Sequence, residues 1–174
     1  MPIFNTPRAG RNQKGYMETL IEKMCVDERV LDKQGYGVVD VSPGVITATF
    51  DNVRNGFGKD NKVKVHYLEI YVELEFGIDK AMEISRFIGD YFYDQGFLAF
   101  INTMVLNNYY LIAVAINAVS YKTGQCFADN NAQYANLYKV LKRVFPADWK
   151  LDVENCVFFN PKDGKGNYIH GKLV

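Results

Sequence analysis

The sequence predicts an α+β fold in one domain, with a mainly antiparallel sheet and helices packed on one face of it. Helix-like and strand-like segments follow one another without an internal repeat or a linker. The strand-like segments meet through short polar turns, such as Asn107-Asn108, which suits a hairpin. Hydrophobic residues make up 48% of the 174 positions, enough for a sizeable core. We expect an arm or loop at residues 1–15 and a single domain at residues 16–174.

Apolar residues at helical spacing predict four helices. Their sequences are YMETLIEKMCVDE from Tyr16, SPGVITATFDNVRNGFG from Ser42, IDKAMEISRFIGDYFYDQGF from about Asp79, and NAQYANLYKVLKRVF from Asn131. In the second, the β-branched VITATF would also suit a strand. Ser42 and Pro43 favour a helix there, since they form a good N-cap and first helical residue. The stripes expected to face the core include Val45, Thr49 and Val53 in the second helix, and Tyr134, Leu137, Leu141 and Val144 in the last.

Alternating or continuous apolar runs predict the strands. These runs are GYGVVDV from Gly35, KVKVHYLEIYVEL from Lys62, LAFINTMV from Leu98, YYLIAVAINAVSY from Tyr109, and a late strand around Trp149 and LDVENCVFF. The segment NPKDGKGN then reads as a turn or loop before a polar tail.

Charge and cysteine content narrow the function classes. Lys plus Arg and Asp plus Glu both number 20, so the chain lacks the basic excess of a dedicated nucleic-acid binder, although a local basic patch is compatible with that balance. Three widely spaced cysteines without a CxxC pair suit reduced thiols rather than a zinc site. The polar N-terminus has no signal-peptide core, and no apolar run approaches the roughly 20 residues of a membrane span. We therefore expect a cytoplasmic protein that does not enter a membrane.

Four segments carry a resemblance to a known family. They are GYGVVDVSPGVITATFDNVRNGFGK, VHYLEIYVELEFGIDKAMEI, GDYFYDQGFLAFINTMV and AINAVSYKTGQCFADNNAQYANLYKVLKRV. Together they span about residues 16–146 and resemble the relaxases, the MobA/VirD2-type mobilisation nucleases of conjugative plasmids and other mobile elements. The last segment is the most specific, with Asn117, Val119, Ser120, Thr123, Gly124 and Phe127 in the family's register.

The resemblance implies a site from which the chemistry is missing. Relaxases nick one DNA strand with a tyrosine, and a divalent metal held by histidines on two central strands polarises the phosphate. Where the family has those ligands, this chain has Met104, Leu106, Tyr109, Leu111 and Ala113. The family's tyrosine aligns with Glu22, which leaves Tyr16 as a displaced candidate nucleophile, and His66 matches a family histidine. The resemblance thus implies neither a metal nor another cofactor.

Three interpretations follow. The first is a catalytically inactive relaxase-like binding module of a mobile element, which contacts single-stranded DNA or a mobilisation protein. The second is a divergent active relaxase that uses Tyr16 with carboxylates such as Glu69 and Glu73. The third is a protein-interaction domain without a nucleic-acid role, which the zero net charge favours. Candidate DNA contacts for the first are Arg8, Arg11, Lys14, Lys59, Lys62 and Lys64.

Overall fold

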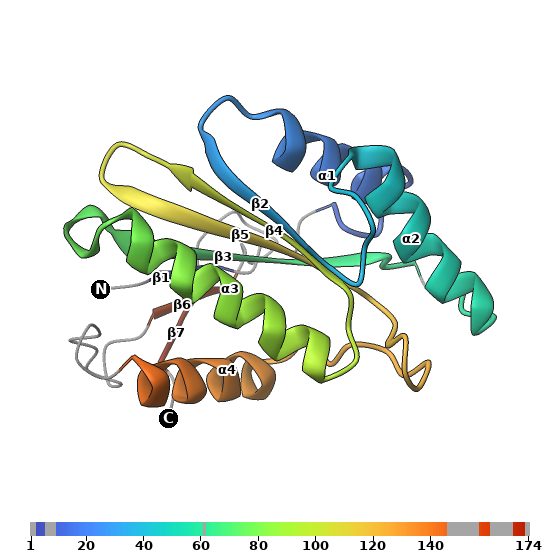
Figure 1. Cartoon of the computed structure of the whole chain (residues 1–174). Helices are drawn as coiled ribbons and strands as arrows, with labels where there is room; N and C mark the ends of the chain where they lie inside the picture. The colour runs from blue at the N-terminus through green and yellow to red at the C-terminus, as the bar shows by residue number, and fades with distance from the viewer. Residues whose placement is uncertain (1–2, 6–9, 61, 146–156, 161–168, 173–174) are drawn as a thin grey trace.

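A mixed sheet forms the centre of the protein and confirms the α+β class. The computed structural model describes residues 3–5, 10–60, 62–145, 157–160 and 169–172. Within them the sheet has seven strands in the order β2-β4-β5-β3-β1-β6-β7 (Figure 1). All pairings are antiparallel except the parallel pair β1–β6. The strands are β1 (Ile3–Asn5), β2 (Val30–Tyr36), β3 (Val65–Glu73), β4 (Ala99–Val105), β5 (Tyr109–Asn117), β6 (Val157–Asn160) and β7 (Ile169–Lys172).

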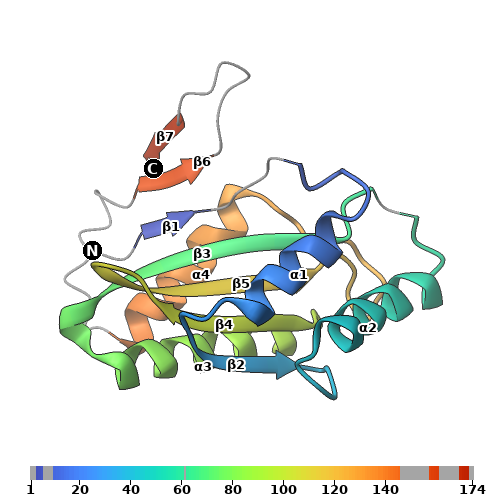
Figure 2. The ribbon, with the colours of Figure 1, turned by 90° about the horizontal axis from the view of Figure 1, so that it is seen from above.

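Helices cover both faces of the sheet, so the prediction that they lie on one face was wrong. Figures 1 and 2 show α1 and α2 on one face and α3 and α4 on the other. The reason lies in β4 and β5, whose continuous apolar runs are buried on both sides and need cover on both. The helices are α1 (Tyr16–Val26), α2 (Pro43–Gly56), α3 (Ile78–Asp94) and α4 (Asn131–Val144), and a short 3-10 helix, η1 (Leu74–Phe76), precedes α3.

Strand alternation sorts the core into two clusters. On the α3–α4 face, Leu68 and Ile70 of β3 and Ile112 of β5 pack with Phe127 and Tyr134. The α1–α2 face holds a second cluster, which contains Met17, Ile21, Ile46, Phe50, Phe100, Met104, Leu111, Ala113 and Ala115. The two faces of one sheet therefore carry separate cores, and residues two apart on a strand share the same one.

Several predicted boundaries shift. The strand expected from Gly35 is β2, which ends at Tyr36 because the chain turns at Gly37, where φ is 74°. A short strand, β1, lies within the segment expected to be an arm or loop, and β7 lies within the expected polar tail. The late strand is confirmed only as β6, which also includes Asn160, the first residue of the expected turn, while Trp149 and residues 161–167 of that turn lie outside the described residues.

Two of the expected core stripes are displaced around their helices. In α2 the buried face is Ile46, Phe50 and Arg54, one position beyond the predicted stripe. In α4, Val144 is 47% exposed. Tyr138 takes its place in the buried stripe, one helical turn after Tyr134. The strands and helices expected at Lys62, Leu98, Tyr109, Tyr16, Ser42, Asp79 and Asn131 are otherwise present.

Gly89 allows α3 to approach β2 closely. A Cβ atom at this position would lie 2.0 Å from the ring of Tyr36, whereas a Cβ on Gly44 of α2 would meet nothing within 4 Å. The Tyr36 hydroxyl also donates to the Arg86 carbonyl of α3 over 3.1 Å. The contact between α3 and the edge of the sheet therefore depends on the missing side chain.

We predict that Gly89→Ala destabilises the protein by about 1–3 kcal/mol, because the added methyl group forces Tyr36 out of its place. The matched control Gly44→Ala should be neutral or stabilising by up to about 1 kcal/mol, since alanine suits an open helical position. Chemical denaturation of both variants measures the difference. Equal stability of the two would contradict the close packing.

Candidate functional site

The positions that the resemblance assigns to metal ligands lie together at one end of the sheet, on the α1 face. Met104 of β4 pairs directly with Leu111 of β5. Leu106 and Tyr109 close the hairpin, where the Leu106 amide donates to the Tyr109 carbonyl over 2.7 Å. Ala113 lies between Asn102 of β4 and Glu69 of β3. The structure thus brings these residues to one place.

This place is filled by apolar side chains. Met104 and Leu111 are each 6% exposed and Ala113 is fully buried. They belong to the same cluster as Met24 of α1, and Leu106 packs against that cluster. Tyr109 lies further out, edge-on to Tyr71 with 6.2 Å between ring centroids. The floor of the expected cleft is therefore apolar and covered by α1.

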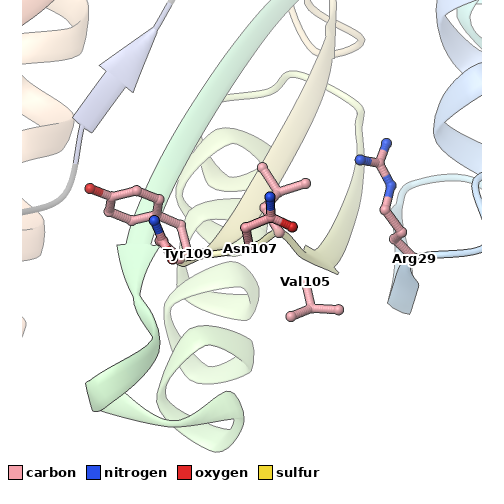
Figure 3. Close-up of a pocket in the computed structure, with 6 residues that line it drawn as sticks. Arg29, Val105, Asn107 and Tyr109 are labelled. Atoms are coloured by element: carbon pink, nitrogen blue, oxygen red, sulfur yellow. The ribbon is translucent and has the colours of Figure 1, made fainter.

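Two adjoining depressions remain beside it. One, of about 280 Å³, has an apolar floor formed by Leu20, Met24, Met104 and Leu111, with Tyr67 and Glu69 at its side. The other, of about 320 Å³, lies between Arg29 and the hairpin from Val105 to Tyr109 (Figure 3). Arg29 lines both depressions, and we call the two together the hairpin groove.

Arg29 is fixed by a two-pronged ion pair. Its Nε donates to Asp27 Oδ1 over 2.9 Å and its Nη2 to Asp27 Oδ2 over 2.6 Å. These bonds lower the pKa of Asp27 to about 2. The pair is exposed to solvent, so it orients the guanidinium at the groove more than it stabilises the fold.

A row of polar side chains on β3 borders the groove. The Tyr71 hydroxyl donates to Glu69 Oε2 over 2.9 Å, and Tyr67 contacts the same carboxylate. Burial, and then the charge of Glu69, raise the pKa of Tyr67 far above its usual value. Sequence reasoning named only Glu69 of this row, although a spacing of two residues on a strand places all three side chains on one face.

Tyr16, the candidate nucleophile, begins α1 near this row. Burial raises its pKa, which Arg11 lowers and Glu69 raises again. A higher pKa disfavours the phenolate that attacks phosphorus. Glu22, at the family's tyrosine position, is exposed on α1. Glu73 faces the same side of the sheet as Glu69, directly opposite Tyr109.

His66 belongs to a second polar group, on the opposite face of the sheet. Its Nδ1 lies 3.6 Å from Asp129 Oδ2. Asp129 also forms an ion pair with Arg11 and accepts a hydrogen bond of 2.7 Å from the Tyr134 hydroxyl. Burial alone would raise the pKa of Asp129, but its contacts with His66, Arg11 and Tyr134 hold it well below the usual value. We call these four residues the Asp129 cluster.

Carboxylates of the chain engage two of the candidate DNA contacts, Arg11 and Lys64. Arg11 is engaged by Asp129. Lys64 lies 3.4 Å from Asp51 and 3.7 Å from Glu18. Lys14, Lys59 and Lys62 are exposed, whereas Arg8 lies outside the described residues.

The SYKTG motif, which carries much of the resemblance, forms a turn next to the end of α3. Ser120 Oγ accepts from the amides of Lys122 and Thr123, and the Gly124 amide donates to the Ser120 carbonyl. Lys122 Nζ donates to the Asp94 carbonyl over 3.0 Å, at the last residue of α3. The motif is thus a tight turn that satisfies the C-terminal end of a helix.

Neither a metal centre nor a membrane segment is evident in the described part of the chain. None of its His, Cys, Asp and Glu side chains form a group of three or more that could hold a metal ion. None of its helices is both long and apolar enough to span a membrane.

Comparison with known proteins does not place the chain in a family. No protein-family model matches the sequence, and no significant match was found among curated proteins or solved structures. The relaxase resemblance therefore stays a prediction.

We predict that Asp129→Asn lowers the free energy of unfolding at pH 7 by about 2 kcal/mol, because Arg11 and Tyr134 lose a charged partner. The pKa of Asp129 is depressed on folding, so its contribution is complete above the pKa of an unfolded aspartate, about 3.9. The deficit should shrink as the pH falls below about 4. Denaturation between pH 7 and 2 tests this, with exposed Asp60→Asn as the control.

Proposed function

We propose that this protein is a relaxase-like binding module without strand-nicking chemistry, which contacts the DNA of a mobile element. The observation that carries the proposal is the burial of Met104, Leu111 and Ala113 under α1 at the positions where relaxases hold their metal. Thioether and hydrocarbon side chains offer a hard divalent cation no suitable ligand there. Burial of unpaired imidazole or carboxylate groups at the same positions would cost several kcal/mol.

A protein partner is the second candidate, and two observations favour it. Arg11 and Lys64, two of the expected phosphate contacts, are engaged with carboxylates of this chain. The floor of the hairpin groove is apolar and includes Met24 and Met104, whose flexible side chains adapt to varied surfaces. A mobilisation protein that inserts an apolar side chain would fit this groove.

We predict that the protein leaves a supercoiled plasmid with a transfer origin intact in the presence of Mn²⁺ or Mg²⁺, because the described residues offer no ligand set for the ion that would polarise the phosphate. Gel electrophoresis over several hours measures relaxation. Relaxation that is lost in Tyr16→Phe, and retained in Tyr91→Phe, would instead support the divergent relaxase that uses Tyr16 near Glu69.

We predict weak binding of single-stranded oligonucleotides that falls steeply with salt. Lys59→Gln combined with Lys62→Gln should flatten the log-log salt slope by about 1.4, at about 0.7 for each phosphate that a lysine no longer neutralises. The control, Lys33→Gln combined with Lys139→Gln, removes the same charge from exposed positions elsewhere. Fluorescence anisotropy is the measurement. Undetectable binding at low salt would transfer support to the protein partner.

A further inference from the structure

Side chains from three separate segments converge on the Asp129 carboxylate. Arg11 approaches from the loop before α1, His66 from the start of β3, and Tyr134 from the first turn of α4. Figure 2 shows the loop before α1 and the start of β3 at the same end of the sheet. Guanidinium, imidazole and phenol groups are hydrogen-bond donors to phosphate and related oxyanions. The Asp129 cluster has the composition of an oxyanion site in which a carboxylate of the chain is the anion.

The start of α4 adds to the attraction for an anion. Asp129 directly precedes Asn130, the N-cap of this 14-residue helix, whose side chain accepts from the Gln133 amide over 3.0 Å. The helix dipole places partial positive charge at this end, where anions are favoured.

The carboxylate leaves one member of the cluster unsatisfied. His66 is 7% exposed, and its Nδ1 makes no hydrogen bond to the described residues. The 3.6 Å to Asp129 Oδ2 is too long for one. Asp129 Oδ2 accepts from Arg11 and Oδ1 accepts from Tyr134, and with both bonds made the planar carboxylate lies too far from the imidazole to bond to it. A phosphate group has further acceptor oxygens in a tetrahedral arrangement and can reach the imidazole as well.

We infer that Arg11, His66, Tyr134 and the N-terminus of α4 form a binding site for a phosphate-class oxyanion, which Asp129 occupies until such an anion displaces it. This inference goes beyond the proposed function, because the site lies on the opposite face of the sheet from the hairpin groove and free phosphate is enough to fill it. Asp129 acts as an internal competitor, so the wild type binds with an apparent affinity reduced by the fraction of time that the site is open.

The histidine ring signals in NMR spectra report on the site directly. The chain has two histidines, and the variant His170→Gln identifies the signal of His66. Titration with inorganic phosphate at constant ionic strength, set with chloride, should shift that signal in the wild type. Asp129→Ala should respond at phosphate concentrations at least about tenfold lower, because the competitor is gone. Arg11→Gln, made in either background, should abolish the response, whereas exposed Lys139→Gln should leave it unchanged.

Two oligothymidylates identify the source of the anion. One carries hydroxyl groups at both ends and offers only phosphodiesters, and the other carries a 5′-phosphate. A shift with both assigns backbone phosphate, and a shift with the second alone assigns a terminal monoester.

The inference is overturned if phosphate and chloride affect His66 equally in both the wild type and Asp129→Ala. The affinity of the wild type for oligonucleotides is measured in a separate experiment. An outcome that overturns this inference therefore does not decide the proposed function. If Asp129→Ala does not fold, the wild type and Arg11→Gln are compared instead. Loss of the phosphate-induced shift of the His66 signal in Arg11→Gln supports the inference, and an unchanged shift overturns it.

Discussion

The cover on both faces of the β4–β5 hairpin is the constraint on which the rest of the structure depends. Every residue from Leu111 to Ser120 is buried, and all of them are apolar except Asn117 and Ser120. Asn102 shows how one polar group is accommodated, because its side-chain amide donates to the Met24 carbonyl over 2.6 Å and joins the end of α1 to the sheet. In the proposed relaxase alignment, the positions of the metal ligands are the positions against which α1 packs. The apolar side chains at these positions and the packing of α1 over them are therefore one structural fact.

Local signals in the sequence predicted most of the elements. Ser42 and Pro43 identified the start of α2 despite its β-branched residues, and Asn107-Asn108 identified the hairpin. Such signals are short in range and act through the backbone, which explains their success. The continuous apolar run of β5 also indicates that helices cover both faces of the sheet, but it was interpreted only as a strand. The start of β2 was missed because Asp32 and Gln34 are polar on an inner face, where Gln34 bonds to both Asp32 and Tyr36.

The candidate sites were harder to predict, because their members are far apart in the chain. The ligand positions came together as expected, since they lie on two strands of one hairpin. Asp129 was missed altogether, for its partner Arg11 is 118 positions away and nothing near either residue signals the pair. Arg11 was assigned to DNA because an isolated basic residue gives no indication of its partner. His66 was placed on a strand correctly, yet its neighbours could come only from tertiary structure.

The position of β1 in the sheet has a consequence for how the chain is made. Phe4 pairs with Ile70 of β3 on one side and with Phe158 of β6 on the other, so β1 must wait for a strand that is synthesised much later than itself. The sheet cannot reach the width described here until β6 and β7 have been synthesised. Until then one edge of β1 or β3 is open to pairing with other chains, as long-range strand contacts form slowly. Truncation before β6 would leave that edge open permanently, which gives shortened products a route to aggregation that the full chain closes on its own.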